Sequence, residues 1–104
     1  MKPDFEVEPA LARAIEDWCQ WLAHERRISS YTLDAYTRDL SKFLQFLPEH
    51  LGFLPGLDDL GALEMKDFRS YLAFRQAGKL ARSSTARAMS TLRNFFNFLE
   101  HRGL

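Results

Sequence analysis

The last quarter of the chain carries an apolar stripe with the period of an α-helix. Ala88, Leu92, Phe95, Phe96 and Leu99 follow one another at spacings of four, three, one and three residues. Such spacing gathers the five side chains on one side of a helix, where they can pack against a core. We therefore predict that residues 81–99 contain a helix and that the glycine at position 103 ends it.

The opposite surface of this helix is predicted to be polar and basic. It carries arginines, amides and hydroxyls, with no acidic side chain before Glu100. Such groups fit a phosphate backbone and the edges of bases. A solvated face on a core helix is the more ordinary interpretation, and the helix alone leaves both open. The polar residues are Ser84, Arg87, Ser90, Thr91, Arg93, Asn94 and Asn97.

Three further segments show the same period, and no segment predicts a β-strand. They cover about residues 9–26, 30–47 and 64–76. Residues 48–61 are rich in glycine and proline and are predicted to be a loop that packs against the helices. The pattern therefore predicts an all-α fold of four helices in one domain.

Serines and a proline predict where two of these helices begin and end. Ser29 or Ser30 can cap the second helix, and Ser83 or Ser84 the fourth, because a hydroxyl accepts a hydrogen bond from a free first-turn amide. Pro48 is predicted to close the second helix, since the residue before a proline avoids helical geometry.

Charged residues are unevenly distributed, although the formal net charge is zero. Residues 1–68 contain 7 Lys and Arg against 13 Asp and Glu, whereas residues 69–104 contain 7 Lys and Arg against a single Glu. Such asymmetry indicates a polyanionic partner such as nucleic acid. The alternative is that the two halves neutralise each other within the fold.

The sequence offers no evident catalytic or metal-binding set. Cys19 is the only cysteine, so neither an internal disulfide nor a zinc site is expected, and its thiol is expected to be buried or half-buried. The three histidines lie far apart and are expected at the surface, while the tyrosines are expected in the core. No nucleophile motif or glycine-rich phosphate loop is visible. We therefore expect no cofactor, no metal and no enzymatic activity in this chain.

The N-terminal residues do not have the features of a targeting segment. Residues 1–8 form a polar, acidic leader that is expected to be flexible. They do not have the charge pattern of a signal peptide, and no apolar run approaches the roughly 20 residues that span a bilayer. A cytoplasmic location is the default expectation.

Three stretches resemble the N-terminal part of Xer-type tyrosine recombinases. They are residues 25–40 with the Phe-Leu pair at 43–44, residues 67–72, and residues 83–99 (SSTARAMSTLRNFFNFL) followed by a glycine. The last stretch follows the family order of Ser, small, Arg, Leu-Ser-x-Leu-Arg, aromatic pair and Phe-Leu, except that Met89 replaces the usual leucine. The resemblance covers about residues 10–104.

This resemblance implies a SAM-like orthogonal bundle in which residues 9–104 form the core-binding domain of a recombinase. Its implied partners are double-stranded recombination-site DNA, its own C-terminal catalytic domain and neighbouring subunits in a DNA-bound tetramer, with no membrane. The domain would help clamp a half-site, as in chromosome dimer resolution at a dif-type site. Strand cutting and rejoining would belong to the catalytic domain, which lies outside this chain. Trp21 on the first helix is a candidate protein-interface residue, and a second packing surface is its alternative role.

The candidate DNA contacts lie on the second and fourth helices and just before the fourth. Arg87 and Arg93 are the strongest candidates, although Arg93 would also suit a structural ion pair with an acid of the first helix. Arg87→Ala is expected to lower duplex affinity without lowering the melting temperature. The full set is Ser30, Thr32, Arg38, Lys42, Lys79, Arg82, Ser84, Arg87, Thr91, Arg93 and Asn94.

A second function remains open from the residues alone. A helical bundle with an acidic first helix and a basic last helix can be a protein-interaction domain that associates head to tail without DNA. Salt would weaken such association.

Overall fold

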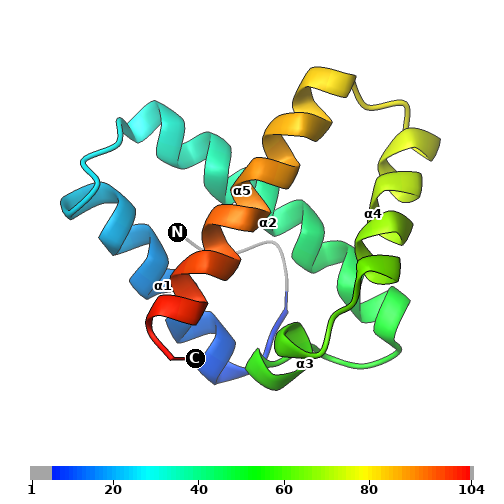
Figure 1. Cartoon of the computed structure of the whole chain (residues 1–104), viewed down its shortest axis with the longest axis horizontal. Helices are drawn as coiled ribbons and strands as arrows, with labels where there is room; N and C mark the ends of the chain where they lie inside the picture. Colours follow the sequence, from blue (N-terminus) through cyan, green and yellow to red (C-terminus); the bar gives the residue numbers. More distant parts are fainter. Residues whose placement is uncertain (1–5, 104) are drawn as a thin grey trace.

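The computed structural model describes residues 6–103, and within this range its regular structure consists of α-helices without β-strands. The predicted all-α fold is confirmed, but the number of helices is five rather than four, because a short helix forms inside the predicted loop (Figure 1). The helices are α1 (Pro9–His24), α2 (Ser30–Leu51), α3 (Leu57–Gly61), α4 (Met65–Ala77) and α5 (Arg82–His101).

The core lies where α5 crosses α2, with α1 packed against both (Figure 1). The predicted apolar stripe of α5 is buried at Ala88, Leu92, Phe95 and Leu99. The Trp18 side chain of α1 is fully buried, and its ring centroid lies 5.2 Å from that of Phe95. The helical period of the sequence therefore identifies the buried side of the longest helices correctly.

The C-terminal end of α2 differs from the prediction. Pro48 lies inside the helix, which continues to Leu51 and ends at Gly52. Gly52 has a left-handed backbone (φ 86°), and its amide donates to the Pro48 carbonyl over 2.8 Å. A proline removes one hydrogen bond from a helix, but packing of neighbouring side chains such as Phe46 and Leu51 against the core holds the last turn in place.

One of the two predicted serine caps is present. The Ser29 hydroxyl accepts a hydrogen bond from the Thr32 amide over 3.1 Å, as expected for the start of α2. The predicted cap by Ser83 or Ser84 is wrong, because α5 already begins at Arg82 and its N-cap residue, Ala81, has no side-chain acceptor.

Two aspartates stabilise the starts of α3 and α4 in the same way. The Gly56 amide donates to the Asp59 carboxylate over 2.8 Å, and the Glu64 amide donates to the Asp67 carboxylate over 2.7 Å. His50, which we expected at the surface, is exposed, and its Nε2 atom lies 2.7 Å from the other oxygen of Asp67. The Glu64 amide, followed by His50, lowers the pKa of Asp67.

The predicted leader, residues 1–8, falls partly outside the described residues, which begin at Glu6. Within the described part, Val7 packs against the core and the Glu8 amide donates to the Pro55 carbonyl over 3.0 Å. These contacts attach residues 7 and 8 to the loop that precedes α3.

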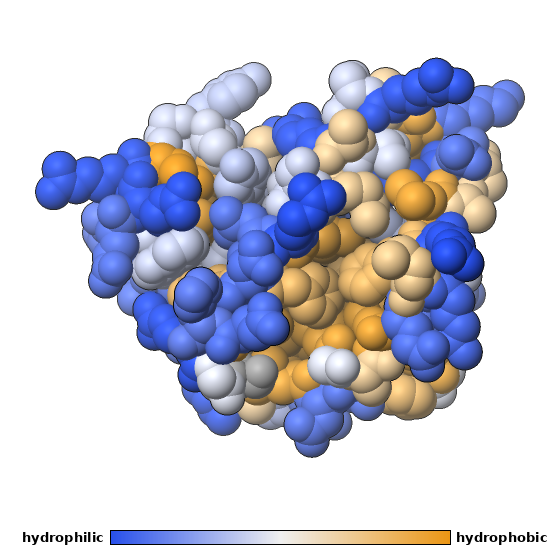
Figure 2. Space-filling view, viewed as in Figure 1, coloured by the Kyte–Doolittle hydropathy of each residue, from blue (hydrophilic) through white to orange (hydrophobic). Residues whose placement is uncertain are grey.

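Helix α4 packs against the core through aromatic rings, and two of its apolar side chains remain exposed. The centroids of Tyr71 and Phe68 lie 5.0 and 5.7 Å from that of Phe43 on α2. Met65 and Phe74 are 67% and 54% exposed. Figure 2 shows hydrophobic surface gathered between α5 and α4 on the face of the molecule in view.

Candidate functional site

Arg87 joins α5 to α2 through a paired hydrogen bond with Asp39. The Arg87 Nε and Nη2 groups donate to the two Asp39 carboxylate oxygens over 3.0 and 2.8 Å. Thr91, one turn further along α5, donates its hydroxyl to the same carboxylate over 3.0 Å. Asp39 therefore receives three hydrogen bonds from α5 and fixes how the two helices cross.

The two charged partners differ greatly in exposure. Only 3% of the Asp39 side chain is exposed, whereas 48% of the Arg87 side chain is exposed. The hydrogen bond and charge of Asp39 raise the pKa of Arg87, so its guanidinium stays cationic. Its Nη1 group makes no hydrogen bond within residues 6–103. Arg87 is thus held by one edge and offers the other edge to solvent.

Of the row Ser84, Arg87, Thr91 and Asn94, which was predicted to face away from the core, the last three bind side chains of α2 and α1. Thr91 is only 1% exposed, so its predicted exposed position is wrong. Asn94 accepts a hydrogen bond from the buried Trp18 indole over 2.8 Å. The error has a physical cause: two neighbouring helices cover α5, so its buried surface is wider than the apolar stripe.

Exposed basic residues of α2 lie on the helix that carries Asp39. Arg38 and Lys42 are both exposed, and their four-residue spacing places them on one side of α2. Tyr31, seven residues before Arg38, shares that side and is 82% exposed. The expectation that every tyrosine packs in the core is therefore wrong for Tyr31.

The remaining candidates lie at the helix starts and on the outer side of α5. Ser30 is the first residue of α2, and Thr32 accepts a hydrogen bond from Ser29 over 3.0 Å. Lys79 has a left-handed backbone (φ 59°) in the turn before α5, and Arg82 is the first residue of α5. Both are exposed. Ser30 and Thr32 therefore lie in the first turn of α2, and Lys79 and Arg82 lie just before and at the start of α5.

Arg93 and Trp21 have different environments. Arg93 is exposed, and no salt bridge to it forms within residues 6–103, so its alternative role as an ion-pair partner of the first helix finds no support there. Trp21 is half-buried, with its ring centroid 5.3 Å from that of Phe98 on α5. This contact agrees with the alternative role given to Trp21 from the sequence, which is packing against another helix.

The described residues offer little for metal or thiol chemistry. No three His, Cys, Asp or Glu side chains of residues 6–103 come close enough to hold a metal ion together. Burial raises the pKa of the half-buried Cys19 thiol. No helix in the described range is both long and apolar enough to cross a membrane.

Comparison with known proteins identifies the family. The family model described as "Phage integrase, N-terminal SAM-like domain" matches residues 15–103. The chain belongs to this family. The predicted SAM-like fold is therefore confirmed, and the resemblance to Xer-type recombinases extends through nearly the whole SAM-like domain.

Several curated relatives are tyrosine recombinases named XerC. The chain is 44% identical over 100 residues to the XerC of Rhodospirillum centenum. This alignment covers 96% of this chain and 29% of that protein. The chain is 40% identical over 98 residues to the XerC of Mesorhizobium japonicum, covering 94% of this chain and 31% of that protein. The chain thus spans about three tenths of these relatives. No solved structure matches the chain.

Sequence reasoning missed the two most deeply buried charged groups of the SAM-like domain. Asp39 follows Tyr36 by three residues and precedes Phe43 by four, so it occupies a core position in the period of α2. That position was a signal for a buried, paired carboxylate. Arg75 is 2% exposed and donates to the Tyr71 and Thr85 hydroxyls over 3.3 and 3.0 Å. Its place in the helical period of α4 predicts burial, but no local pattern indicates that it joins α4 to α5.

Proposed function

We propose that this chain is the N-terminal DNA-binding domain of a XerC-like site-specific tyrosine recombinase. It helps clamp one recombination half-site, while a catalytic domain outside this chain cuts and rejoins the strands. Membership of the integrase SAM-like family and the likeness to XerC recombinases support this proposal. Resolution of chromosome dimers, contact with neighbouring subunits and a cytoplasmic location follow as further parts of the same proposal.

The observation that carries the proposal is the position of Arg87. Its guanidinium is held against α2 by Asp39, and nearly half of the side chain remains exposed. A guanidinium fixed by one edge can present its other edge to a phosphate oxygen or to a guanine. Because Asp39 fixes the side chain before DNA arrives, less conformational freedom is lost on binding.

The exposed residues of α2 extend this surface. Arg38 and Lys42 place two further positive charges on the helix that holds Arg87, and Tyr31 adds an exposed aromatic ring at the start of that helix. Lysine and arginine side chains that neutralise phosphates release counterions, which makes the affinity dependent on salt. Ser30, Thr32 and Ser84 supply hydroxyl groups suited to phosphate oxygens.

Fluorescence anisotropy with a labelled dif-type half-site duplex tests the proposal, with a scrambled duplex as the comparison. Affinity should fall steeply between about 50 and 300 mM salt. The Arg38→Gln/Lys42→Gln variant should bind more weakly, and the slope of log affinity against log salt should shrink by roughly 0.9 for each lost phosphate contact. Arg13→Gln, which removes one exposed positive charge from α1, should leave the slope unchanged.

Two results would count against the proposal. The first is that the double variant and Arg13→Gln weaken duplex binding equally, which would indicate a diffuse charge effect. The second is that no duplex binds at low salt while the chain elutes from a sizing column as a salt-sensitive oligomer. That outcome would favour the protein-interaction domain.

A further inference from the structure

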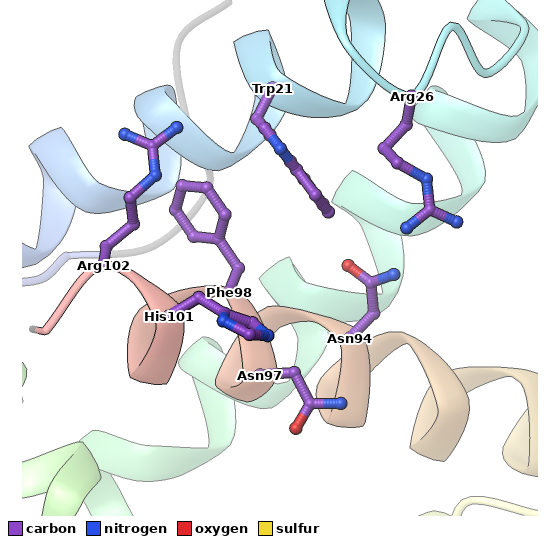
Figure 3. A pocket seen from close by; sticks show the side chains of 7 residues that line it. All are labelled: Trp21, Arg26, Asn94, Asn97, Phe98, His101 and Arg102. Carbon is purple, nitrogen blue, oxygen red and sulfur yellow. The ribbon is translucent and has the colours of Figure 1, made fainter.

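A cavity of about 350 Å³ opens between the C-terminal parts of α1 and α5 (Figure 3). Trp21 and Phe98 form its aromatic wall, and their ring centroids are 5.3 Å apart. The cavity lies toward the opposite end of α5 from Arg82 and Arg87, and Asn94 is the one candidate DNA contact that lines it.

Two arginines flank the aromatic wall, one from each helix end. The Arg26 guanidinium carbon lies 5.4 Å from the centroid of the Trp21 ring, and that of Arg102 lies 4.8 Å from the centroid of Phe98. Stacking on the rings restrains both side chains, which leaves their N–H groups available to an anion. Figure 3 shows them on either side of the Trp21–Phe98 pair.

The other polar groups of the cavity add hydrogen-bond donors without adding negative charge. The Asn94 side-chain oxygen already accepts from Trp18, so its NH₂ group is the part left for a ligand. His101 also lines the cavity, and none of its lining residues is acidic. The cavity therefore combines cationic ends, amide donors and an apolar aromatic wall.

We propose that this cavity binds an acidic peptide segment of a partner protein. An apolar side chain of the peptide packs against Trp21 and Phe98, and flanking carboxylates meet Arg26 and Arg102. Carboxylates suit the planar guanidinium fork, which can bind both oxygens at once. A recess between two helices admits side chains of a peptide, whereas the backbone of a rigid duplex would pass over it.

The test uses the whole chain and a fluorescein-labelled peptide with the core Asp-Glu-Leu-Glu-Asp. Anisotropy should report binding with a Kd below about 1 mM. The matched peptide Asn-Gln-Leu-Gln-Asn should bind at least about tenfold more weakly, because the charge-assisted hydrogen bonds are lost. Trp21 fluorescence should change on binding of the acidic peptide and provides a readout that needs no label.

Variants locate the binding to this cavity. Arg26→Gln and Arg102→Gln should each weaken binding of the acidic peptide about tenfold, whereas Arg13→Gln on the exposed surface of α1 should not. Circular dichroism should show unchanged melting for all three, since these side chains are exposed.

Three outcomes would overturn the proposal. They are absence of acidic-peptide binding, equal binding of the acidic and neutral peptides, and equal weakening by Arg13→Gln and the two cavity variants. A further contrary result would be that Arg26→Gln and Arg102→Gln weaken half-site duplex binding but leave peptide binding unchanged. The cavity would then be part of the phosphate-binding surface.

Discussion

Arg87 and Arg75 both join α5 to a neighbouring helix, but they do so in opposite ways. Arg87 pairs with a buried carboxylate and keeps 48% of its side chain exposed. Arg75 is 2% exposed, and within the described residues its side-chain hydrogen bonds go only to the neutral hydroxyls of Tyr71 and Thr85. Its guanidinium also lies 5.8 Å from the centroid of the Tyr71 ring.

The difference separates a structural arginine from one that can also bind a ligand. A fully buried guanidinium contributes through packing and hydrogen bonds, and it presents no donor to an outside partner. Arg87 instead divides its donors between Asp39 and solvent. Changes at Arg75 should therefore affect stability alone, whereas changes at Arg87 should affect stability and duplex binding together.

The largest expected effect is on stability, from Arg75→Ala. Loss of a buried side chain and of its two hydrogen bonds should cost about 3 kcal/mol. For a domain of this size the melting temperature should fall by roughly 12–24 °C, as measured by circular dichroism. Arg75→Met, which keeps most of the volume, should cost about 1 kcal/mol. Equal losses in the two variants would show that charge rather than packing matters at this position.

Arg87→Ala should lower both stability and affinity. It leaves the buried Asp39 carboxylate with Thr91 as its remaining side-chain donor, at a cost of about 2 kcal/mol after allowance for the exposure of Arg87. This corrects the expectation from sequence that the melting temperature would not change. Adding Asp39→Asn should restore part of the stability, measured by urea unfolding, but none of the duplex affinity. Recovery of affinity in that double variant would contradict a direct role of Arg87.

A matched pair of threonine variants sharpens the comparison between the two arginines. Thr91→Val removes a donor to Asp39, and Thr85→Val removes an acceptor from Arg75. Each should lower the free energy of unfolding by about 1–2 kcal/mol. Only Thr91→Val should also weaken duplex binding, by a few fold, because it loosens the carboxylate that holds Arg87. If Thr85→Val weakens duplex binding as much, the division between the two arginines does not hold.

The smallest expected effect is at the Asp67 end of α4. The pKa of Asp67 is lowered in the fold, first by the Glu64 amide and then by His50. Its contribution to stability is therefore fully present above the pKa of the unfolded chain, near 3.9, and is lost as the pH falls through the lower folded pKa. Urea unfolding between about pH 5 and 2 should show that the free energy of unfolding falls less with decreasing pH in Asp67→Asn than in the natural chain. Equal acid dependence in the two proteins would exclude this contribution.

Helices with long periodic patterns were predicted correctly from the sequence. The predictions were wrong where a short segment, or a contact between residues distant in sequence, determines the structure. The stripe predicted for α5 is buried at Ala88, Leu92, Phe95 and Leu99, because these side chains repeat the helical spacing. Helix α3 was missed because five residues are too few to show a period, and the Gly56–Asp59 hydrogen bond at its start is a local signal. Pro48 was read as a helix end, although packing of the following turn outweighs one missing hydrogen bond.

The candidate site shows the same division. Arg87 was predicted to contact DNA, and this stays a prediction. Its partner Asp39 lies 48 positions away in the sequence, and no local pattern identifies which acid it meets. Thr91 and Asn94 have polar side chains and were therefore placed on an exposed face. Their hydrogen bonds to Asp39 and Trp18 form only when three helices come together.

Duplex binding by the variant Asp39→Asn/Arg87→Gln, measured over a salt series, tests the central claim most directly. The two substitutions leave the net charge of the chain unchanged and keep polar groups at both positions, so a change in affinity reports the exposed edge of Arg87. We predict about tenfold weaker half-site binding, with the slope of log affinity against log salt smaller by about 0.9. Affinity and slope equal to those of the natural chain would contradict the claim that Arg87 contacts DNA.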